Sequence, residues 1–291
     1  MSIVPALESP YIELTWISTG FSQLNKLMGG GVPTRRITEV SGNYSVGKST
    51  LALQVVSKAQ EMGMDVLWAD TEYQFTTPYA ESLGVDCSAL QLLQTRFAED
   101  VLDEIEKWAT EHRDALIILD SVGNLVVREE AEKTAEGRTI GGLARAIAKF
   151  CRKMTPILAE NNLALLVLNH QVIDIMSGRI KTSGGTKLEY AKSIWIKLRW
   201  TNQNIMKGDE QVGKVIEAEI GKNKLVGTLK QSCELSMIYG QGFNAEQDKL
   251  QEMMAAGTIT KQGRNFFYQG EKVASSMADA REWIKSLADS K

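Results

Sequence analysis

The stretch that decides the fold reads GNYSVGKST and runs from Gly42 to Thr50. Within it, Gly42, Gly47, Lys48 and Ser49 satisfy the spacing G-x-x-x-x-G-K-[ST]. Glycines let successive backbone N–H groups turn inward around phosphate oxygens, and a following helix adds partial positive charge at its N-terminus. The lysine reaches the β- and γ-phosphates, and the hydroxyl ligates magnesium. The motif predicts a site for ATP and Mg²⁺ formed by Gly42, Asn43, Tyr44, Ser45, Val46, Gly47, Lys48, Ser49 and Thr50.

The segments around this loop have the periodicity that such a site requires. Residues 36–42 (RITEVSG) read as a strand that enters the Gly-rich turn, and residues 48–62 have helical spacing. Further apolar strands are predicted at 64–70, 90–95, 115–120 and 164–169, with helices at 97–110 and 143–160. This alternation predicts an α/β fold with a P-loop ATPase core, in which helices cover both faces of a mostly parallel central sheet.

The pattern changes after residue 190. Strands at 193–200, 214–221 and 229–240 follow one another without long helices, which predicts antiparallel strands at one edge of the sheet. Beyond residue 240, helical segments near 248–256 and 277–287 flank an aromatic run. We therefore expect a short N-terminal arm (1–16) that contacts another protomer, an ATPase core (17–240) and a small C-terminal α+β lobe (241–291).

Acidic residues at strand ends are the next candidates for the site. Asp120 ends the apolar strand ALIILD, where it would hold magnesium through water together with Ser49. Glu72 and Asp70 both follow the strand VLWAD, and one of them would activate the attacking water. Side chains two residues apart on a strand point the same way, so spacing alone does not separate these two acids.

Composition narrows the class of protein. The 291 residues are 43% hydrophobic and 24% charged, the balance of an ordinary globular protein, and no apolar run is long enough to span a membrane. Three scattered cysteines and the lack of a signal sequence indicate a reduced, cytoplasmic protein. The net charge of −3 argues against binding nucleic acid over the whole surface, but a local basic groove remains compatible with DNA.

Six ordered motifs then identify a resemblance. They are WISTGFSQLNKLMGGGVP, GNYSVGKST, WADTEYQFTTPYAESLGVD, LDSVGN, TSGGTKLEY and GKNKL, and the match covers nearly the whole chain, from about Ile17 to Trp283. In order and spacing the sequence resembles the RecA-family DNA strand-exchange recombinases. The TEY…TPY segment, SVGNL and the pair NH look closer to phage recombinases of the UvsX type than to bacterial RecA. The resemblance therefore points to a bacterial or bacteriophage-infected cell.

The resemblance implies roles for individual residues of the nucleotide site. Glu72 matches the catalytic glutamate, and Tyr79 matches the aromatic residue that packs on adenine. Asn169 and His170 fall where the family places a polar pair that senses the γ-phosphate and signals to a DNA-binding loop. The second position is usually Gln, and the adjacent Gln171 could share its role. Lys222 and Lys224 match the lysines that reach the neighbouring subunit's ATP.

Two polar, Gly-containing segments, 128–142 and 172–185, are the DNA-binding candidates. The first leads into a helix with basic residues, and the second is itself basic, which suits contacts to the phosphate backbone. In the family, apolar residues of these loops also insert between bases, for which Ile140 and Ile180 are the candidates. The full set of DNA-binding candidates is Arg145, Arg152, Ile140, Arg179, Ile180, Lys181, Gly184 and Gly185.

The resemblance implies an ATP-dependent recombinase that forms a filament on single-stranded DNA and exchanges strands with homologous duplex. It implies DNA-stimulated hydrolysis of ATP to ADP and phosphate, a role in homologous recombination and repair of DNA damage, and a single-strand-binding protein and a loader as partners. Two alternatives stay open, a RecA-like ATPase that regulates another recombinase and a hexameric DNA motor. Only 16 residues precede ISTG, and Glu189 stands where bacterial RecA has lysine, so filament and ring geometries both remain possible.

Overall fold

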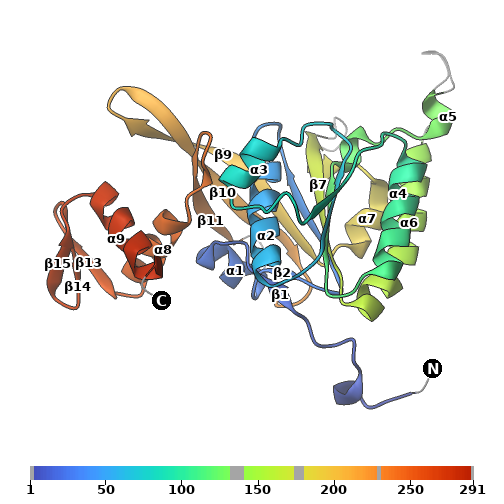
Figure 1. Ribbon diagram of the computed structural model, residues 1–291, viewed down its shortest axis with the longest axis horizontal. Helices are drawn as coiled ribbons and strands as arrows, with labels where there is room; N and C mark the ends of the chain where they lie inside the picture. The colour runs from blue at the N-terminus through green and yellow to red at the C-terminus, as the bar shows by residue number, and fades with distance from the viewer. Residues whose placement is uncertain (1–2, 132–140, 174–179, 228–230, 290–291) are drawn as a thin grey trace.

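The computed structural model describes residues 3–131, 141–173, 180–227 and 231–289 (Figure 1). A ten-stranded sheet forms its centre, with strand order β12-β11-β10-β9-β3-β7-β6-β4-β5 and β8 paired to β7. The strands from β9 to β5 in this order run parallel. They are β3 (Ile37–Gly42), β4 (Val66–Asp70), β5 (Leu90–Leu93), β6 (Leu116–Asp120), β7 (Ala164–Ile173) and β9 (Ile194–Lys207).

Antiparallel strands complete one edge of this sheet. They are β10 (Glu210–Asn223), β11 (Ser232–Ile238) and β12 (Gly242–Phe243), while β8 (Ile180–Thr182) pairs antiparallel with the end of β7. The predicted α/β class, with a mostly parallel sheet and antiparallel strands at one edge, is confirmed. One detail differs from the sequence pattern, because β9 pairs parallel with β3 and only its other neighbour is antiparallel.

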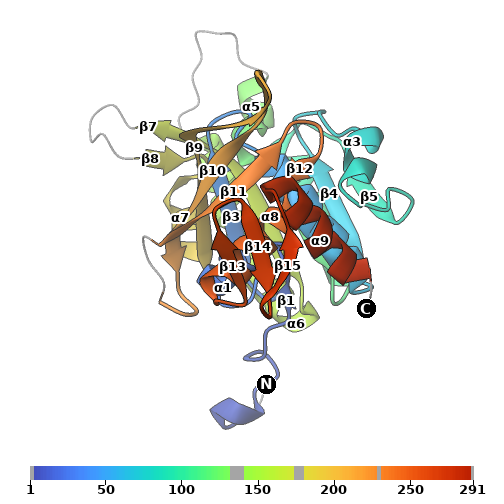
Figure 2. The same cartoon turned by 90° about the vertical axis from the view of Figure 1, so that its left-hand side faces the viewer.

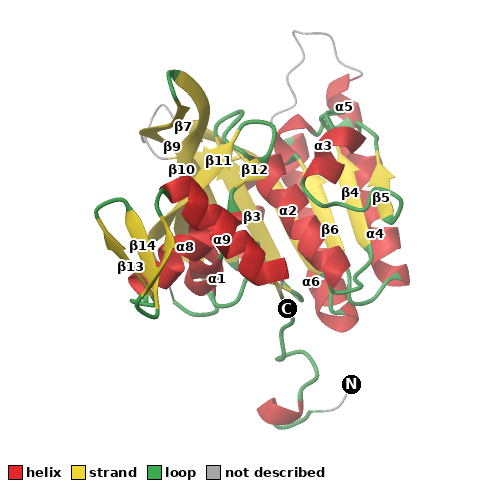
Figure 3. Cartoon of the chain, turned by 60° about the vertical axis from the view of Figure 1, so that its left-hand side comes forward, coloured by secondary structure: helices red, strands yellow, loops and turns green. Residues whose placement is uncertain are grey.

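Helices cover both faces of the sheet, as Figure 3 shows. One apolar cluster joins the sheet to α1 (Ser22–Met28), α2 (Lys48–Glu61) and α3 (Thr77–Ser82). A second cluster joins the opposite face to α4 (Ala98–Glu111), α6 (Gly142–Asn161) and α7 (Gly185–Ala191). Every residue of β3, β4 and β6 is buried, which explains why the stretch ALIILD that contains β6 reads as a continuous apolar run.

The N-terminal arm extends away from the rest of the chain (Figure 1). It contains the short turn η1 (Ala6–Glu8) and leads to β1 (Trp16–Ile17), which pairs with β2 (Val32–Pro33). The side chains of Ile3 and Leu7 are almost fully exposed.

The C-terminal lobe has its own apolar core and lies beside the antiparallel edge of the sheet (Figure 2). Asp248 anchors it, because one carboxylate oxygen accepts hydrogen bonds from the backbone N and the Oγ of Ser22, each at 2.7 Å. The division of the chain at residues 16 and 240 remains an interpretation. The elements of the lobe are α8 (Ala245–Ala255), β13 (Ile259–Gln262), β14 (Asn265–Tyr268), β15 (Glu271–Ala274) and α9 (Met277–Asp289).

Within the described ranges, every helix is too short or too polar to cross a lipid bilayer.

Candidate nucleotide site

The Gly-rich loop connects the carboxyl end of β3 to the N-terminus of α2. Gly47 caps this helix with φ 94°, a left-handed conformation in which a side chain is strained. A Cβ there would also lie 2.8 Å from Cζ of Phe243, and a Cβ on Gly42 would lie 2.6 Å from Cγ1 of Val46. Glycine is therefore required at both positions by local geometry, independently of any ligand.

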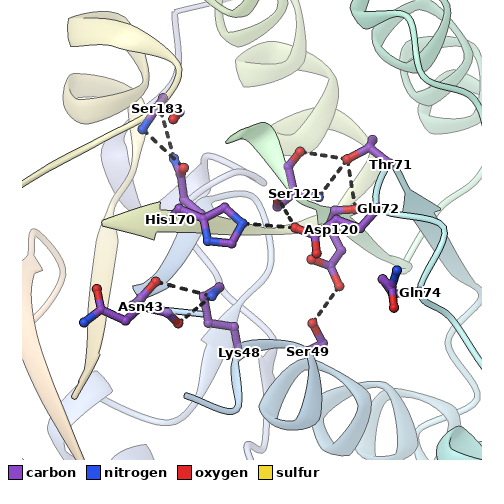
Figure 4. Close-up of polar contacts among 12 residues, drawn as sticks. Asn43, Lys48, Ser49, Thr71, Glu72, Gln74, Asp120, Ser121, His170 and Ser183 are labelled. Carbon is purple, nitrogen blue, oxygen red and sulfur yellow. Dashed lines mark hydrogen bonds and ion pairs between the residues drawn. The ribbon is translucent and has the colours of Figure 1, made fainter. Parts of the chain in front are cut away.

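A cavity of about 420 Å³ opens in front of this loop (Figure 4). It lies where β3, β4, β6 and β7 end. Side chains from β6, from β7, from α2 and from the segments that follow β3 and β4 converge on it. Its volume falls in the range of small-molecule sites. The lining residues are Tyr44, Ser45, Gly47, Lys48, Ser49, Thr50, Glu72, Gln74, Tyr79, Asp120, His170, Met237, Ile238, Tyr239 and Gly240.

Lys48 is buried at the base of the cavity. Its Nζ donates to the carbonyl oxygens of Asn43 at 2.9 Å and Gly42 at 3.3 Å. Burial lowers the pKa of Lys48, and the carboxylates of Asp120 and Glu72 only partly oppose this effect. An ammonium group held by weak carbonyl partners gains from an anionic ligand, because phosphate oxygens offset its desolvation.

Asp120 and Ser49 form the part of the site that fits magnesium. The Oγ of Ser49 donates to Oδ2 of Asp120 at 2.8 Å. Burial raises the pKa of Asp120 to about 7, and the nearby Glu72 and Asp70 add to the shift. A buried carboxylate beside a hydroxyl supplies the hard oxygen donors that Mg²⁺ prefers. Ser49 would hold the ion directly and Asp120 would hold it through water, and phosphate oxygens would complete its set of ligands.

Glu72 points into the cavity from the segment after β4. Its Oε1 accepts a hydrogen bond from Oγ of Ser121 at 2.6 Å and lies 3.1 Å from Nε2 of His170 (Figure 4). The side chain of Glu72 is 24% exposed and that of His170 is 34% exposed. Both groups can therefore meet a ligand or a water molecule in the cavity.

Asp70 occupies a different place from Glu72, although spacing on the strand left the two acids equivalent. Its carboxylate accepts from the backbone N–H groups of Glu72, Gln74 and Phe75, at 3.1 to 3.3 Å, and from Nε2 of Gln94 at 3.0 Å. Asp70 is 1% exposed and is not among the lining residues. It shapes the loop that carries Glu72.

The polar residues near the end of β7 are Asn169, His170 and Gln171. They point in different directions because alternate side chains of a strand face opposite ways. His170 lines the cavity, whereas Asn169 is fully buried and does not. The Asn169 amide donates to the carbonyl of Ser183 at 2.8 Å and accepts from its N–H at 3.2 Å. Gln171 donates to Oγ of Ser41 at 3.0 Å. A direct phosphate contact by Asn169 or Gln171 does not fit this geometry.

Tyr79 lines the cavity as the sequence predicted, and its Oη lies 2.9 Å from Oγ1 of Thr50. Other lining residues were not anticipated from the sequence. The lining residues Met237 and Ile238 at the end of β11, and Tyr239 and Gly240 in the turn that leads to β12, were missed. Tyr239 in this turn also accepts a hydrogen bond from Nε2 of Gln211 at 2.8 Å. No local motif marks the turn, since it reaches the cavity only because the antiparallel edge of the sheet packs against the Gly-rich loop.

Lys222 and Lys224 lie far from this cavity. Asn223 between them is level with Ile194 on β9 and Thr38 on β3, at the amino end of the parallel strands. The cavity lies at their carboxyl ends. The ammonium groups of Lys222 and Lys224 contact the carbonyl oxygens of Glu189 and Tyr190, respectively, on α7. Burial and the charges of Lys224 and Lys192 lower the pKa of Lys222 to about 8.

The basic DNA-binding candidates on α6 are exposed. Arg145 has a side-chain exposure of 68% and lies 3.7 Å from Glu129 on the short helix α5 (Arg128–Ala131). Arg152 is also exposed and lies seven residues further along, on the same helix face.

The candidates of the second segment divide between β8 and the start of α7. Ile180 and Lys181 lie on β8, paired with the end of β7. Gly185 is exposed, whereas Gly184 is buried, and a Cβ on it would lie 3.0 Å from Leu188. The burial of Gly184 indicates a tight turn more than a DNA contact. Ile140 and Arg179 lie outside the described residues.

The class of protein follows from this arrangement. A Gly-rich loop joins the central strand β3 to α2, with carboxylates at the ends of neighbouring parallel strands and an antiparallel edge folded beside the loop. Together these features define a RecA-like P-loop core.

Comparison with known proteins gives the family. Residues 2–244 match the model of the RecA N-terminal domain, so the chain belongs to the RecA family. It is 32% identical to Protein RecA of Thermus aquaticus over 282 residues, which cover 96% of this chain and 83% of that protein. It is 30% identical to Protein RecA of Ruminococcus albus over 277 residues, which cover 94% of this chain and 69% of that protein.

Proposed function

We propose that the chain is an ATP-dependent recombinase. It assembles on single-stranded DNA, pairs that strand with a homologous duplex and exchanges the strands, with ATP hydrolysis stimulated by DNA. One observation carries this proposal. The cavity gathers Lys48, Ser49, Glu72 and Asp120 at the carboxyl end of the parallel strands, whereas Lys222 and Lys224 lie at the amino end.

Within the cavity each group has a chemical task. Lys48 and the loop N–H groups bind the triphosphate, and Glu72 takes a proton from the attacking water. Tyr79 packs on the adenine. Ser49 and Asp120 would hold Mg²⁺, which neutralises phosphate charge when bound.

The charge balance of the cavity supports a contribution from a second copy. Among the lining residues, the positive charge of Lys48 is opposed by the carboxylates of Glu72 and Asp120. A bound triphosphate adds further negative charge, so more cations are needed in a complete site. Lys222 and Lys224 cannot reach their own cavity, but in a head-to-tail assembly they would face the cavity of the next copy. Repetition of such a contact generates a helical filament or a closed ring.

A route from nucleotide to DNA is part of the proposal. His170 lines the cavity, and its neighbour Asn169 holds Ser183 at the end of the second DNA-binding segment. A change at His170 on γ-phosphate binding or release would be transmitted to this segment through the strand. Arg145 and Arg152 on α6, with Lys181, would contact the DNA phosphates.

Further parts of the proposal rest on the sequence. The exposed Ile3 and Leu7 of the arm would pack on the neighbouring protomer. The kinship with UvsX-type phage recombinases rests on the motifs TEY…TPY, SVGNL and NH, whereas the relatives named above are bacterial RecA proteins. We place the activity in the cytoplasm of a bacterial or phage-infected cell, with a single-strand-binding protein and a loader as partners.

ATPase rates with and without single-stranded DNA test the ATPase part of the proposal. We expect stimulation by DNA in the wild-type chain and no turnover in Lys48→Ala. The matched control is Lys58→Ala, which removes a surface lysine of the same helix. If DNA never stimulates hydrolysis, the recombinase proposal is wrong.

Strand exchange with homologous and unrelated duplexes then separates a recombinase from a regulator. We expect exchanged product with the homologous duplex and none with the unrelated duplex. Electron microscopy with a non-hydrolysable ATP analogue and DNA separates the geometries. Helical filaments are expected, closed rings would favour a hexameric motor, and filaments without strand exchange would favour the regulator.

A further inference from the structure

Glu72 has a hydrogen-bond donor that the proposed reaction does not yet use. Ser121 follows Asp120 at the end of β6, and its Oγ donates to Oε1 of Glu72 at 2.6 Å. This distance is that of a charge-assisted O–H···O⁻ bond. Ser121 is fully buried, so its hydroxyl has no exchange with bulk water to compete with this bond.

Thr71 holds Ser121 in place. The backbone N–H of Ser121 donates to Oγ1 of Thr71 at 2.9 Å, and the same Oγ1 donates to the Ser121 carbonyl at 2.8 Å. The N–H of Thr71 donates to the carbonyl of Asp120 at 2.7 Å. These bonds join the ends of β4 and β6 directly beneath Glu72. The backbone of Ser121 is therefore fixed by several buried hydrogen bonds, and its Oγ is held within hydrogen-bond distance of the carboxylate.

The two carboxylate oxygens of Glu72 therefore have different hydrogen-bond partners. Oε1 accepts a hydrogen bond from Ser121 and contacts Nε2 of His170, whereas Oε2 has no hydrogen bond to any described residue. A general base must offer a free lone pair within hydrogen-bond reach of the proton it removes. We infer that Ser121 is a positioning residue, which clamps Oε1 so that Oε2 of Glu72 is left to accept the proton of the attacking water. This inference rests on the proposed function of Glu72.

Ser121 and His170 contact the same oxygen of Glu72, but the Ser121 contact is buried and the His170 contact is open to a ligand. His170 is one-third exposed and lies near the start of the second DNA-binding segment, so a ligand can displace it. Ser121 is fixed in the core and would hold Glu72 in every state of the site. The other charged groups that face Glu72 are Lys48 and Asp120, which the nucleotide and the magnesium would occupy.

Steady-state ATPase kinetics of Ser121→Ala test the inference. We expect kcat to fall about 10- to 100-fold, the effect of losing one hydrogen bond to a charged group. The KM for ATP and the affinity for a fluorescent ATP analogue should stay unchanged, because Ser121 is not among the lining residues. The matched control is Ser57→Ala, a buried serine on α2 outside the cavity.

A double-mutant cycle distinguishes positioning from a structural effect. If Ser121 acts through Glu72, Ser121→Ala should lower the residual rate of Glu72→Gln no further. An equal proportional loss in both backgrounds overturns the inference, as does an unchanged kcat in Ser121→Ala. Should the alanine variant fail to fold, Ser121→Cys keeps the size and weakens the donor, and a smaller loss confined to kcat is then expected.

The same data separate this inference from the proposed function. An active, DNA-stimulated wild type with an unaffected Ser121→Ala variant refutes the positioning role alone. A wild type that hydrolyses no ATP refutes both.

Discussion

Nε2 of His170 lies 3.1 Å from Oε1 of Glu72, so the residue expected to sense the γ-phosphate contacts the residue expected to activate water. His170 therefore helps to fix the carboxylate that must face the attacking water. We expect His170→Ala to lower DNA-stimulated ATPase turnover by about 10-fold, because a hydrogen bond to a charged group is lost. His170→Gln, which keeps a hydrogen-bonding amide at this position, should retain most of the activity. The measurement is DNA-stimulated turnover of the two variants and the wild type at one pH.

His112→Ala is the control for this experiment, since it replaces the other histidine of the chain, which caps the C-terminus of α4 and is not among the residues that line the cavity. If His170→Gln loses as much activity as His170→Ala, the hydrogen bond to Glu72 is not what His170 contributes.

Lys222 leads to a prediction at alkaline pH. Its pKa is lowered to about 8, mainly by burial and then by Lys224 and Lys192. The ammonium charge is therefore present below pH 8 and is lost as the pH rises through this value. Arginine stays charged over the whole range. The ratio of DNA-stimulated ATPase in Lys222→Arg to that in wild type should rise between pH 7 and 9.5, whereas a ratio independent of pH would contradict a role for the Lys222 charge.

The trans role of the lysines can be tested by mixing two inactive variants. Glu72→Gln lacks the water-activating group but keeps both lysines, and Lys222→Ala/Lys224→Ala has the opposite defect. Neither should turn over ATP alone. In an equal mixture about one quarter of head-to-tail interfaces combine an intact Glu72 with intact lysines, so about a quarter of the wild-type rate should return. A mixture as inactive as its components would show that the lysines act within their own chain or not at all.

The sequence predicted some of these features and missed others for physical reasons. The Gly-rich loop was predictable because its chemistry lies in consecutive residues, and buried parallel strands read as continuous apolar runs. The choice between Asp70 and Glu72 could not be derived from spacing, since a strand places both on one face. It depends on Gln94 and on three backbone N–H groups that gather around Asp70.

The missed residues are those that tertiary packing alone brings to the cavity. Tyr239 belongs to the antiparallel edge, far along the chain from Gly47, and nothing in its own segment signals a nucleotide. Asn169 was expected at the phosphate, but strand alternation turns it toward Ser183. Adjacent residues of a strand point to opposite faces, so the structure brings His170 to the cavity and turns Asn169 to Ser183.

The ionised carboxylate of Asp120 should lower the free energy of unfolding of the chain without nucleotide or metal. Its pKa in the folded state is raised to about 7 by burial, from 3.8, so the folded chain binds the extra proton between these values. Stability therefore falls as the pH rises through this window and stays low above it. Asp120→Asn removes the buried charge, and we expect it to raise the free energy of unfolding by roughly 2 to 4 kcal/mol at pH 8 and by little at pH 4.5.

Urea unfolding without nucleotide and with a chelator measures this effect. The control is Asp103→Asn, which removes an exposed carboxylate from α4 and should change stability little at either pH. A stability gain in Asp120→Asn that is equal at pH 4.5 and pH 8, or a loss at pH 8, would show that the buried charge is not the cause.

Arg145 gives a test of the DNA surface that does not depend on hydrolysis. Its guanidinium is exposed and lies 3.7 Å from Glu129, so a DNA phosphate would replace a weak, solvated ion pair. Each phosphate neutralised releases counterions and steepens the dependence of affinity on salt. We expect Arg145→Ala to reduce the slope of log affinity against log salt by about 0.7 for single-stranded DNA.

Glu129→Gln should strengthen DNA binding, because the carboxylate that competes with DNA phosphate for Arg145 is gone. Lys107→Ala on the neighbouring helix α4, equally exposed, should leave the slope unchanged. A slope that Arg145→Ala does not alter would place the DNA path elsewhere on the molecule, whatever the ATPase measurements show.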